Sequence, residues 1–163
     1  MSRLRAALGS LAFLVVAPGV VAGIVPWALV GWQTHTAWRP LQVAGGVLIG
    51  AGIGVVLHAF ARFVLEGVGT PAPVAPTERL VVGGLYRFVR NPMYLAVGAT
   101  IVGQALVLGR PALLAYAVAF GGVVATFVRF YEEPTLAARY GRQYADYRRA
   151  VPAWWPRRRP WTA

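Results

Sequence analysis

The sequence predicts an all-α integral membrane protein with about four transmembrane helices. Hydrophobic residues make up 58% of the 163 residues and charged residues only 13%, whereas a soluble domain has roughly a quarter of its residues charged. Four apolar runs follow one another along the chain, and polar or proline-rich segments separate them. These observations indicate that lipid, rather than water, surrounds most of the chain.

The first two apolar runs, at residues 11–32 and 41–65, each supply the roughly 20 residues that a membrane-spanning helix needs. The first run is also longer than the apolar stretch of a cleaved signal peptide, so we expect it to stay in the membrane. Pro18 and Pro26 interrupt this run, and neighbouring helices in a membrane tolerate the kinks that such prolines produce. Both runs are therefore predicted to be transmembrane helices.

Three glycines of the second run, Gly46, Gly50 and Gly54, recur at four-residue spacing. This spacing predicts a smooth helix face that another helix approaches closely. The partner is either a helix of the same chain, with Gly19 and Gly23 facing the strip, or a second copy of the chain in a homodimer. The sequence favours packing within one chain and leaves the homodimer open.

The third and fourth apolar runs, at residues 92–108 and 111–130, are separated by Gly109 and Arg110 alone. We therefore expect a short helical hairpin. A polar segment rich in proline and glycine, residues 66–91, precedes the hairpin and is too long for a passive connector. The chain is thus predicted to divide into residues 1–65, with two transmembrane helices, and residues 66–163, with the cofactor-binding catalytic region.

The segment after Tyr131 predicts an amphipathic helix at the membrane interface. Pro134 suits the first turn of a new helix, which Glu132 and Glu133 precede. Apolar and aromatic residues then recur at three- and four-residue spacing, with arginines at the positions between them. The residues of this face are Leu136, Tyr140, Tyr144 and Tyr147, and the aromatic and basic residues that follow are Trp154, Trp155, Trp161 and Arg157–Arg159.

The charges indicate the orientation in the membrane. All 16 basic residues are arginines, against 5 acidic residues, and they lie at the ends of apolar runs rather than on a basic face for nucleic acid. With four spans, 14 arginines lie on the side of both termini, and only Arg39 and Arg110 lie opposite. The positive-inside rule therefore predicts that both termini and the long loop are cytoplasmic.

The sequence offers no set of metal ligands. Cysteine is absent and there are two histidines, His35 and His58, which are too few for a histidine-based zinc site. His58 and Gln104 each lie within a predicted span, where an interhelical hydrogen bond is the expected role. A role for His58 as a catalytic base is the alternative.

Three features mark a candidate site at the cytoplasmic face: the segment Gly83–Tyr94, the segment Tyr131–Pro134, and the tyrosine-rich helix behind it, whose tyrosines are expected to pack rather than to catalyse. Arg90 and Asn91 open the third helix, and Glu132 and Glu133 follow the fourth. Because a hairpin returns the chain to the same face, these groups are expected to be neighbours despite about 40 residues of separation. Ionisable groups gathered at a membrane face favour a functional site. The alternative is ordinary anchoring by the arginines and capping by the glutamates.

The run Gly-Leu-Tyr-Arg-Phe-Val-Arg-Asn-Pro-Met-Tyr at Gly84–Tyr94, followed by a hairpin and then Tyr131-Glu132-Glu133-Pro134, resembles the membrane methyltransferase superfamily. That superfamily includes isoprenylcysteine carboxyl methyltransferases and phospholipid N-methyltransferases. The run at 140–147 with Val151-Pro152 is also similar, so the resemblance extends over residues 66–156. The order and spacing of these pieces make it specific.

The resemblance implies that S-adenosylmethionine is the cofactor and binds on the cytoplasmic side. It places one set of residues on one side of the cofactor pocket, Tyr86, Arg90, Asn91, Pro92 and Tyr94, and Glu132 and Glu133 on the other. The isoprenylcysteine enzymes usually have histidine where this chain has Asn91, which argues against a prenylcysteine substrate. Asparagine is also seen in the phospholipid branch.

These residue types suit methyl transfer. Carboxylates complement the cationic groups and the ribose diol of the cofactor, and an arginine can bind its carboxylate through two hydrogen bonds. In-line transfer needs alignment more than a covalent nucleophile or a metal, and Glu133 is the candidate catalytic residue for orienting the acceptor. We expect a lipid or prenyl-type acceptor. An NADPH-dependent membrane reductase of the sterol-reductase type and a non-catalytic membrane scaffold are the alternatives.

Overall fold

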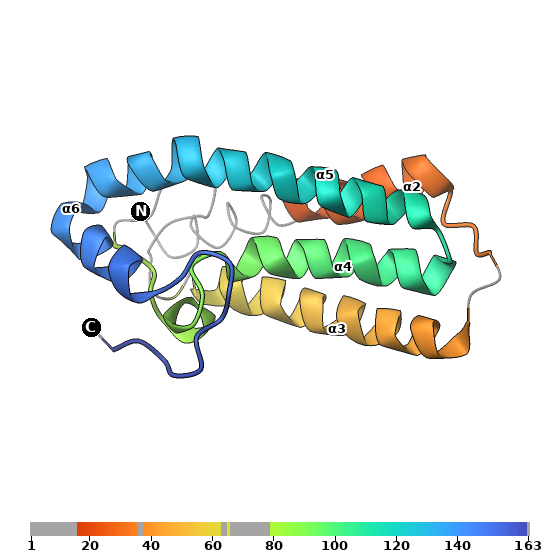
Figure 1. Cartoon of the computed structure of the whole chain (residues 1–163), viewed down its shortest axis with the longest axis horizontal. Coiled ribbons are helices and arrows are strands. Elements are labelled where there is room, and N and C mark those ends of the chain that lie inside the picture. Colours follow the sequence, from red (N-terminus) through yellow and green to blue (C-terminus); the bar gives the residue numbers. More distant parts are fainter. Residues whose placement is uncertain (1–15, 36–37, 63–64, 66–78, 163) are drawn as a thin grey trace. The chain divides into compact units, whose positions relative to one another are not determined.

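The computed structural model describes residues 16–35, 38–62, 65 and 79–162 (Figure 1). All regular structure in these ranges is helical, which confirms the all-α prediction. In chain order the elements are η1 (Val20–Ile24), α2 (Val25–Val30), α3 (Arg39–Arg62), η3 (Gly84–Arg87), α4 (Pro92–Leu108), α5 (Pro111–Phe127), η4 (Val128–Glu132) and α6 (Glu133–Ala150).

The described residues fall into two compact units. The bundle unit takes those between 15 and 56 and between 93 and 125, and the loop unit takes those between 57 and 92 and between 126 and 163. Each unit therefore combines segments that are distant in sequence. The predicted division near residue 65 concerns which part of the chain holds the cofactor, and it stays a prediction.

Two helices are long and apolar enough to cross a bilayer by length and composition. These are α3 and the apolar part of the continuous helix Pro111–Ala150. Val16–Val30 and α4 are shorter apolar helices. Large apolar side chains such as Val47 and Val118 are 65% and 77% exposed, which suits a lipid environment. The structure thus supports membrane association, and the count of four spans stays a prediction.

In the bundle unit, α3 and α4 pack closely through glycines. A Cβ atom built on Gly45 would lie 2.5 Å from the carbonyl oxygen of Gly103, and one on Gly52 would lie 2.7 Å from that of Ala96. By contrast, a Cβ at Gly46, Gly50 or Gly54 would meet no described atom within 4 Å. Packing of the Gly46, Gly50 and Gly54 strip within the described part of the chain was therefore predicted wrongly, because Gly45 and Gly52, seven residues apart on one face, make the contact instead; the homodimer alternative stays a prediction.

The first helix of the bundle unit is joined to α4 and α5 by polar side chains. The Nε2 of Gln104 donates a hydrogen bond to the carbonyl of Ala22 at 2.7 Å, and Trp32 Nε1 donates to Gln104 Oε1 at 3.2 Å. Tyr116 donates to the carbonyl of Val21 at 2.8 Å. The predicted interhelical role of Gln104 is therefore confirmed.

The hairpin between α4 and α5 also forms as predicted. Gly109 has a positive φ of 62°, a conformation that glycine adopts without steric cost. The backbone N–H of Arg110 then donates to the carbonyl of Ala105 at 3.0 Å. Leu113 is fully buried, and it packs with Leu108, Ala105 and Val30.

In the loop unit the chain stays helical beyond Tyr131. It passes through the wide π-helical turn η4 directly into α6, where a new helix had been expected at Pro134. The wide turn precedes Pro134, whose ring does not fit against a regular α-helical turn. This continuity fixes Glu133 rigidly at the start of α6.

Gly141 then breaks α6. Its φ of 51° and ψ of −122° are non-helical, and Figure 1 shows the second half of α6 turning back. Tyr144 and Tyr147 are consequently buried, and with Val151 they form a core to which Leu80, Val82 and Trp161 contribute. The tyrosines were predicted to pack rather than to catalyse, and this core confirms that they pack; the position of the helix at the membrane interface stays a prediction.

Candidate functional site

The loop that carries the Gly84–Tyr94 motif lies against the end of α3. Gly84 has a positive φ of 57°, and a Cβ built on it would lie 2.5 Å from His58 Nε2 and 2.9 Å from Arg62 Nε. A larger residue would therefore be strained in its backbone and would collide with both side chains. His58 thus lies beside this glycine of the motif, and its expected interhelical hydrogen bond stays a prediction.

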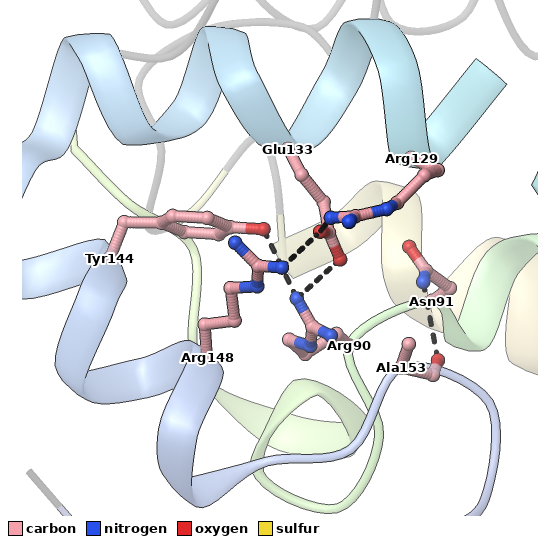
Figure 2. Close-up of polar contacts among 7 residues, drawn as sticks. All are labelled: Arg90, Asn91, Arg129, Glu133, Tyr144, Arg148 and Ala153. Atoms are coloured by element: carbon pink, nitrogen blue, oxygen red, sulfur yellow. Dashed lines mark hydrogen bonds and ion pairs between the residues drawn. The ribbon is translucent and has the colours of Figure 1, made fainter. Parts of the chain in front are cut away.

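Arg90 and Glu133 form the centre of the candidate site. Arg90 Nη1 donates a hydrogen bond to Glu133 Oε1 at 2.7 Å, and the two side chains are only 12% and 8% exposed (Figure 2). The predicted meeting of the motif with the acidic pair, across 43 residues, is thus confirmed for Arg90 and Glu133. Withdrawing two charges from water is costly unless both are well bonded, so further partners are needed.

Those partners come from α6 and its flanks. Arg148 Nη2 lies 3.1 Å from Glu133 Oε2, Arg129 Nη1 lies 3.9 Å from the same oxygen, and Arg90 Nη1 also donates to the hydroxyl of Tyr144 at 3.2 Å (Figure 2). Both oxygens of Glu133 are therefore engaged. We call Arg90, Arg129, Arg148 and Glu133 the arginine–glutamate cluster. It holds three positive charges and one negative charge, a surplus of two.

One donor in the cluster remains unused. Arg90 Nε is buried and has no hydrogen-bond partner among the described residues. Buried polar groups in folded proteins are almost always bonded. An unused guanidinium donor in a cluster with surplus positive charge suits an anionic group such as a carboxylate.

The aromatic groups beside the cluster are strongly buried. Tyr147 donates its hydroxyl to the carbonyl of Tyr86 at 2.7 Å. Burial raises the pKa of Tyr147 well above its usual value, and burial also raises the pKa of Tyr144, which the charge of Arg90 partly offsets. Both tyrosines are therefore neutral hydrogen-bonding groups under ordinary conditions.

Two of the other predicted site residues, Tyr86 and Asn91, form hydrogen bonds within the loop unit. The main-chain carbonyl of Tyr86 accepts the Tyr147 hydroxyl, and the buried Asn91 donates from Nδ2 to the carbonyl of Ala153 at 3.2 Å (Figure 2). Glu132 is half-buried at the end of η4, and Pro92 is buried at the start of α4. Tyr94 follows in α4 and belongs to the bundle unit. Their roles toward a cofactor stay predictions.

The sequence prediction included the tyrosine-rich helix in the candidate site but did not name Tyr144 or Arg148 as site residues. Their four-residue spacing places them on neighbouring positions of one helix face, which was the available signal. The prediction instead assigned this face to packing at the membrane interface. It could not foresee the turn at Gly141 that brings Tyr144 and Arg148 to Arg90 and Glu133.

A C-terminal strap, residues 151–161, lies along the motif loop. The backbone N–H of Arg90 donates to Pro152, that of Arg157 to Phe88 at 2.9 Å, and that of Trp161 to Arg87 at 2.9 Å. Arg87 Nε in turn donates to the carbonyl of Trp161 at 2.7 Å. The strap is therefore bonded to the loop at both of its ends.

Comparison with known proteins identifies the family context. The model of a family described as phospholipid methyltransferase matches residues 41–143. Comparisons with curated proteins and with solved structures give no match. The matched range includes the whole motif and Glu133 but ends before Tyr144, Arg148 and the strap. In the described part of the chain, no group of three metal-ligating side chains is present.

Proposed function

The chain belongs to the phospholipid methyltransferase family, and we propose that it is an integral membrane enzyme that uses S-adenosylmethionine to methylate a lipophilic acceptor. The observation that carries this proposal is the buried Arg90–Glu133 pair. It joins the Gly84–Tyr94 motif to the acidic residues after α5, and both lie within the matched range.

The cluster suits the cofactor's charged end. S-adenosylmethionine supplies an electrophilic methyl group on a sulfonium, and it also carries a carboxylate. The surplus positive charge and the unused Nε of Arg90 support binding of that carboxylate. We assign one wall of the site to the motif residues Tyr86, Arg90, Pro92 and Tyr94, with Asn91 as a neighbour that bonds to Ala153, and the opposite wall to Glu132 and Glu133.

Glu133 acts in this proposal by orientation. Both of its oxygens already bond to arginines, so it holds Arg90 in place rather than taking a proton from the acceptor. Fixed groups of this kind lower the barrier by aligning the reacting atoms. Water is kept from the buried Arg90 and Glu133 by the tyrosines around them.

The membrane arrangement in the proposal has four spans and cytoplasmic termini. Residues 66–163 hold the cofactor, and residues 1–65 complete a lipid-facing wall through which the acceptor enters. The exposed apolar surfaces of α3 and α5 support a bilayer around the bundle unit. The excess of arginine in the loop unit supports placing that unit on the cytoplasmic side.

The proposal is tested by calorimetric titration of S-adenosylmethionine into detergent-purified protein. Wild type, Glu133→Gln and Asp146→Asn are compared, because Asp146 is an exposed acid on the same helix that pairs with Arg149 alone among the residues described. We expect saturable binding that Glu133→Gln weakens at least tenfold and that Asp146→Asn leaves within twofold.

NADPH is titrated in parallel. If a protein shown to be folded by circular dichroism binds NADPH and not S-adenosylmethionine, the reductase alternative replaces the proposal. If the folded protein binds neither NADPH nor S-adenosylmethionine, in detergent and in lipid nanodiscs, the scaffold alternative replaces the proposal.

A further inference from the structure

We propose that the C-terminal strap is a positioning part of the methyl-donor site, and that Asn91 serves this site by holding the strap. This inference rests on the proposed function. It assigns a role to residues 151–161, which lie outside the family match, and it gives Asn91 a task other than direct contact with the cofactor.

Backbone hydrogen bonds join the strap to the loop along its length. The strap carbonyl of Pro152 accepts the Arg90 N–H at 3.0 Å, and the loop carbonyls of Phe88 and Arg87 accept strap N–H groups. These bonds fix the backbone of the loop at and just before Arg90. The side chain of Arg90 is fixed separately by Glu133.

The side-chain amide of Asn91 is hydrogen-bonded to the strap. Asn91 is 7% exposed, and its Nδ2 donates to the carbonyl of Ala153, one residue beyond the strap carbonyl that bonds Arg90 (Figure 2). A buried amide that loses its partner is costly, so Asn91 favours the docked strap. Arg87 performs the same task at the far end through Trp161.

The strap has no regular secondary structure that would hold it in place. The described residues 151–162 contain no helix or strand, so the strap depends on side-chain anchors and loop bonds. Val151 is fully buried beside Tyr147, and Trp161 stacks obliquely on Tyr147 with ring centroids 5.3 Å apart. Between these two apolar anchors, the polar bonds set the register of strap and loop.

The expected consequence is that the strap and Asn91 act as one unit. Releasing the strap should let the Arg90 backbone shift and so weaken binding of S-adenosylmethionine by tenfold or more. Removing Asn91 as well should then add little. A direct contact between Asn91 and the cofactor predicts the opposite, namely an independent loss.

The first test follows the strap itself by hydrogen exchange with mass spectrometry. The strap amides of Arg157 and Trp161 are bonded to the loop, so exchange in this peptide should be slow in wild type and at least tenfold faster in Asn91→Asp, whose carboxylate cannot donate. Asn91→His keeps an N–H donor and should restore slow exchange. Gln143→Glu, the same amide-to-acid change at an exposed position of α6, is the control and should have no effect.

The second test is a double-mutant cycle on the affinity for S-adenosylmethionine. It compares Asn91→Asp, a chain ending at Val151, and the two changes combined, each checked for folding by circular dichroism. The chain ending at Val151 keeps this buried residue but loses the Pro152 carbonyl that bonds Arg90. Support requires that the combined protein binds no more than twofold more weakly than the truncated one.

Two results would overturn the proposal. One is unchanged strap exchange in Asn91→Asp, and the other is a further loss of affinity when Asn91→Asp is added to the truncation. If truncation abolishes measurable binding, the comparison moves to Asn91→His in the full chain, which must then bind within threefold of wild type. A wild-type protein with a protected strap that binds no S-adenosylmethionine would refute the proposed function and the positioning role together.

Discussion

Replacing Glu133 by glutamine should destabilise the protein more than any other single charge change in the loop unit. The side chain is 8% exposed and is the shared partner of Arg90, Arg148 and Arg129. Glutamine has nearly the same shape but no charge. The substitution therefore leaves the buried guanidinium of Arg90 without a counter-charge while disturbing packing little.

The magnitude follows from the exposure of the three arginines. Removing one partner of a buried ion pair costs about 3–5 kcal/mol, and the amide oxygen of glutamine still accepts one bond from Arg90, which favours the lower figure. Arg148 and Arg129 are 44% and 65% exposed, so each contributes about 0–1 kcal/mol. The expected loss is about 3–4 kcal/mol, or roughly 6–16 °C in midpoint for a chain of this size.

The measurement is thermal unfolding in detergent, followed by circular dichroism, for Glu133→Gln, Arg129→Gln and Asp146→Asn. Arg129→Gln and Asp146→Asn remove exposed partners and should each lower the midpoint by about 4 °C or less. The reasoning is refuted if Glu133→Gln lowers the midpoint no further than Asp146→Asn, or if Arg129→Gln matches Glu133→Gln.

Three further predictions concern packing and pH. Gly52→Ala should cost about 1–3 kcal/mol of stability because its Cβ would press on the α4 backbone. Gly50→Ala places its Cβ in open space, so it should be neutral or stabilise the protein by up to about 1 kcal/mol. Equal thermal midpoints in the two variants would contradict this packing. Tyr147→Phe should lose about 1–2 kcal/mol at neutral pH, because the Tyr86 carbonyl loses its donor. Since burial raises the Tyr147 pKa, the stability that this hydroxyl contributes is present below about pH 10 and is lost as pH rises further. Denaturant titrations should therefore show a shallower loss of unfolding free energy at alkaline pH in the phenylalanine variant. A loss as steep as that of wild type would refute the role of burial. Gln104→Leu should cost about 1–2 kcal/mol by leaving the Ala22 carbonyl and the Trp32 indole without their partner, and an unchanged midpoint would show that these bonds contribute nothing.

The sequence predicted those features that depend on local composition and chain direction. The boundaries of α4 and the start of α5 were predicted as observed, because Pro92 and Pro111 suit helix starts and Gly109 suits the turn. Arg90 and Glu133 were expected to meet because a short hairpin returns the chain to one face. Composition and the length of the apolar runs together were sufficient for the all-α class.

The remaining features depend on contacts that no local pattern encodes. The glycine face of α3 is selected by its fit to Gly103 of α4, so the regular spacing of Gly50 and its neighbours was misleading. The partner of Asn91 lies in a strap without periodic structure. Tyr144 reaches Arg90 only because a single glycine reverses the helix direction.

That glycine also decides the direction in which the helix Pro111–Ala150 ends. The helix Pro111–Ala150 has 40 residues, and as a straight rod it would measure about 60 Å, twice the hydrocarbon thickness of about 30 Å. Half of it would then stand in water as a stalk. The φ of 51° at Gly141 instead turns the last nine residues, about 14 Å of helix, back toward the loop that carries Arg90. One residue thus determines whether the end of this helix continues away from the arginine–glutamate cluster or contributes Arg148 to it.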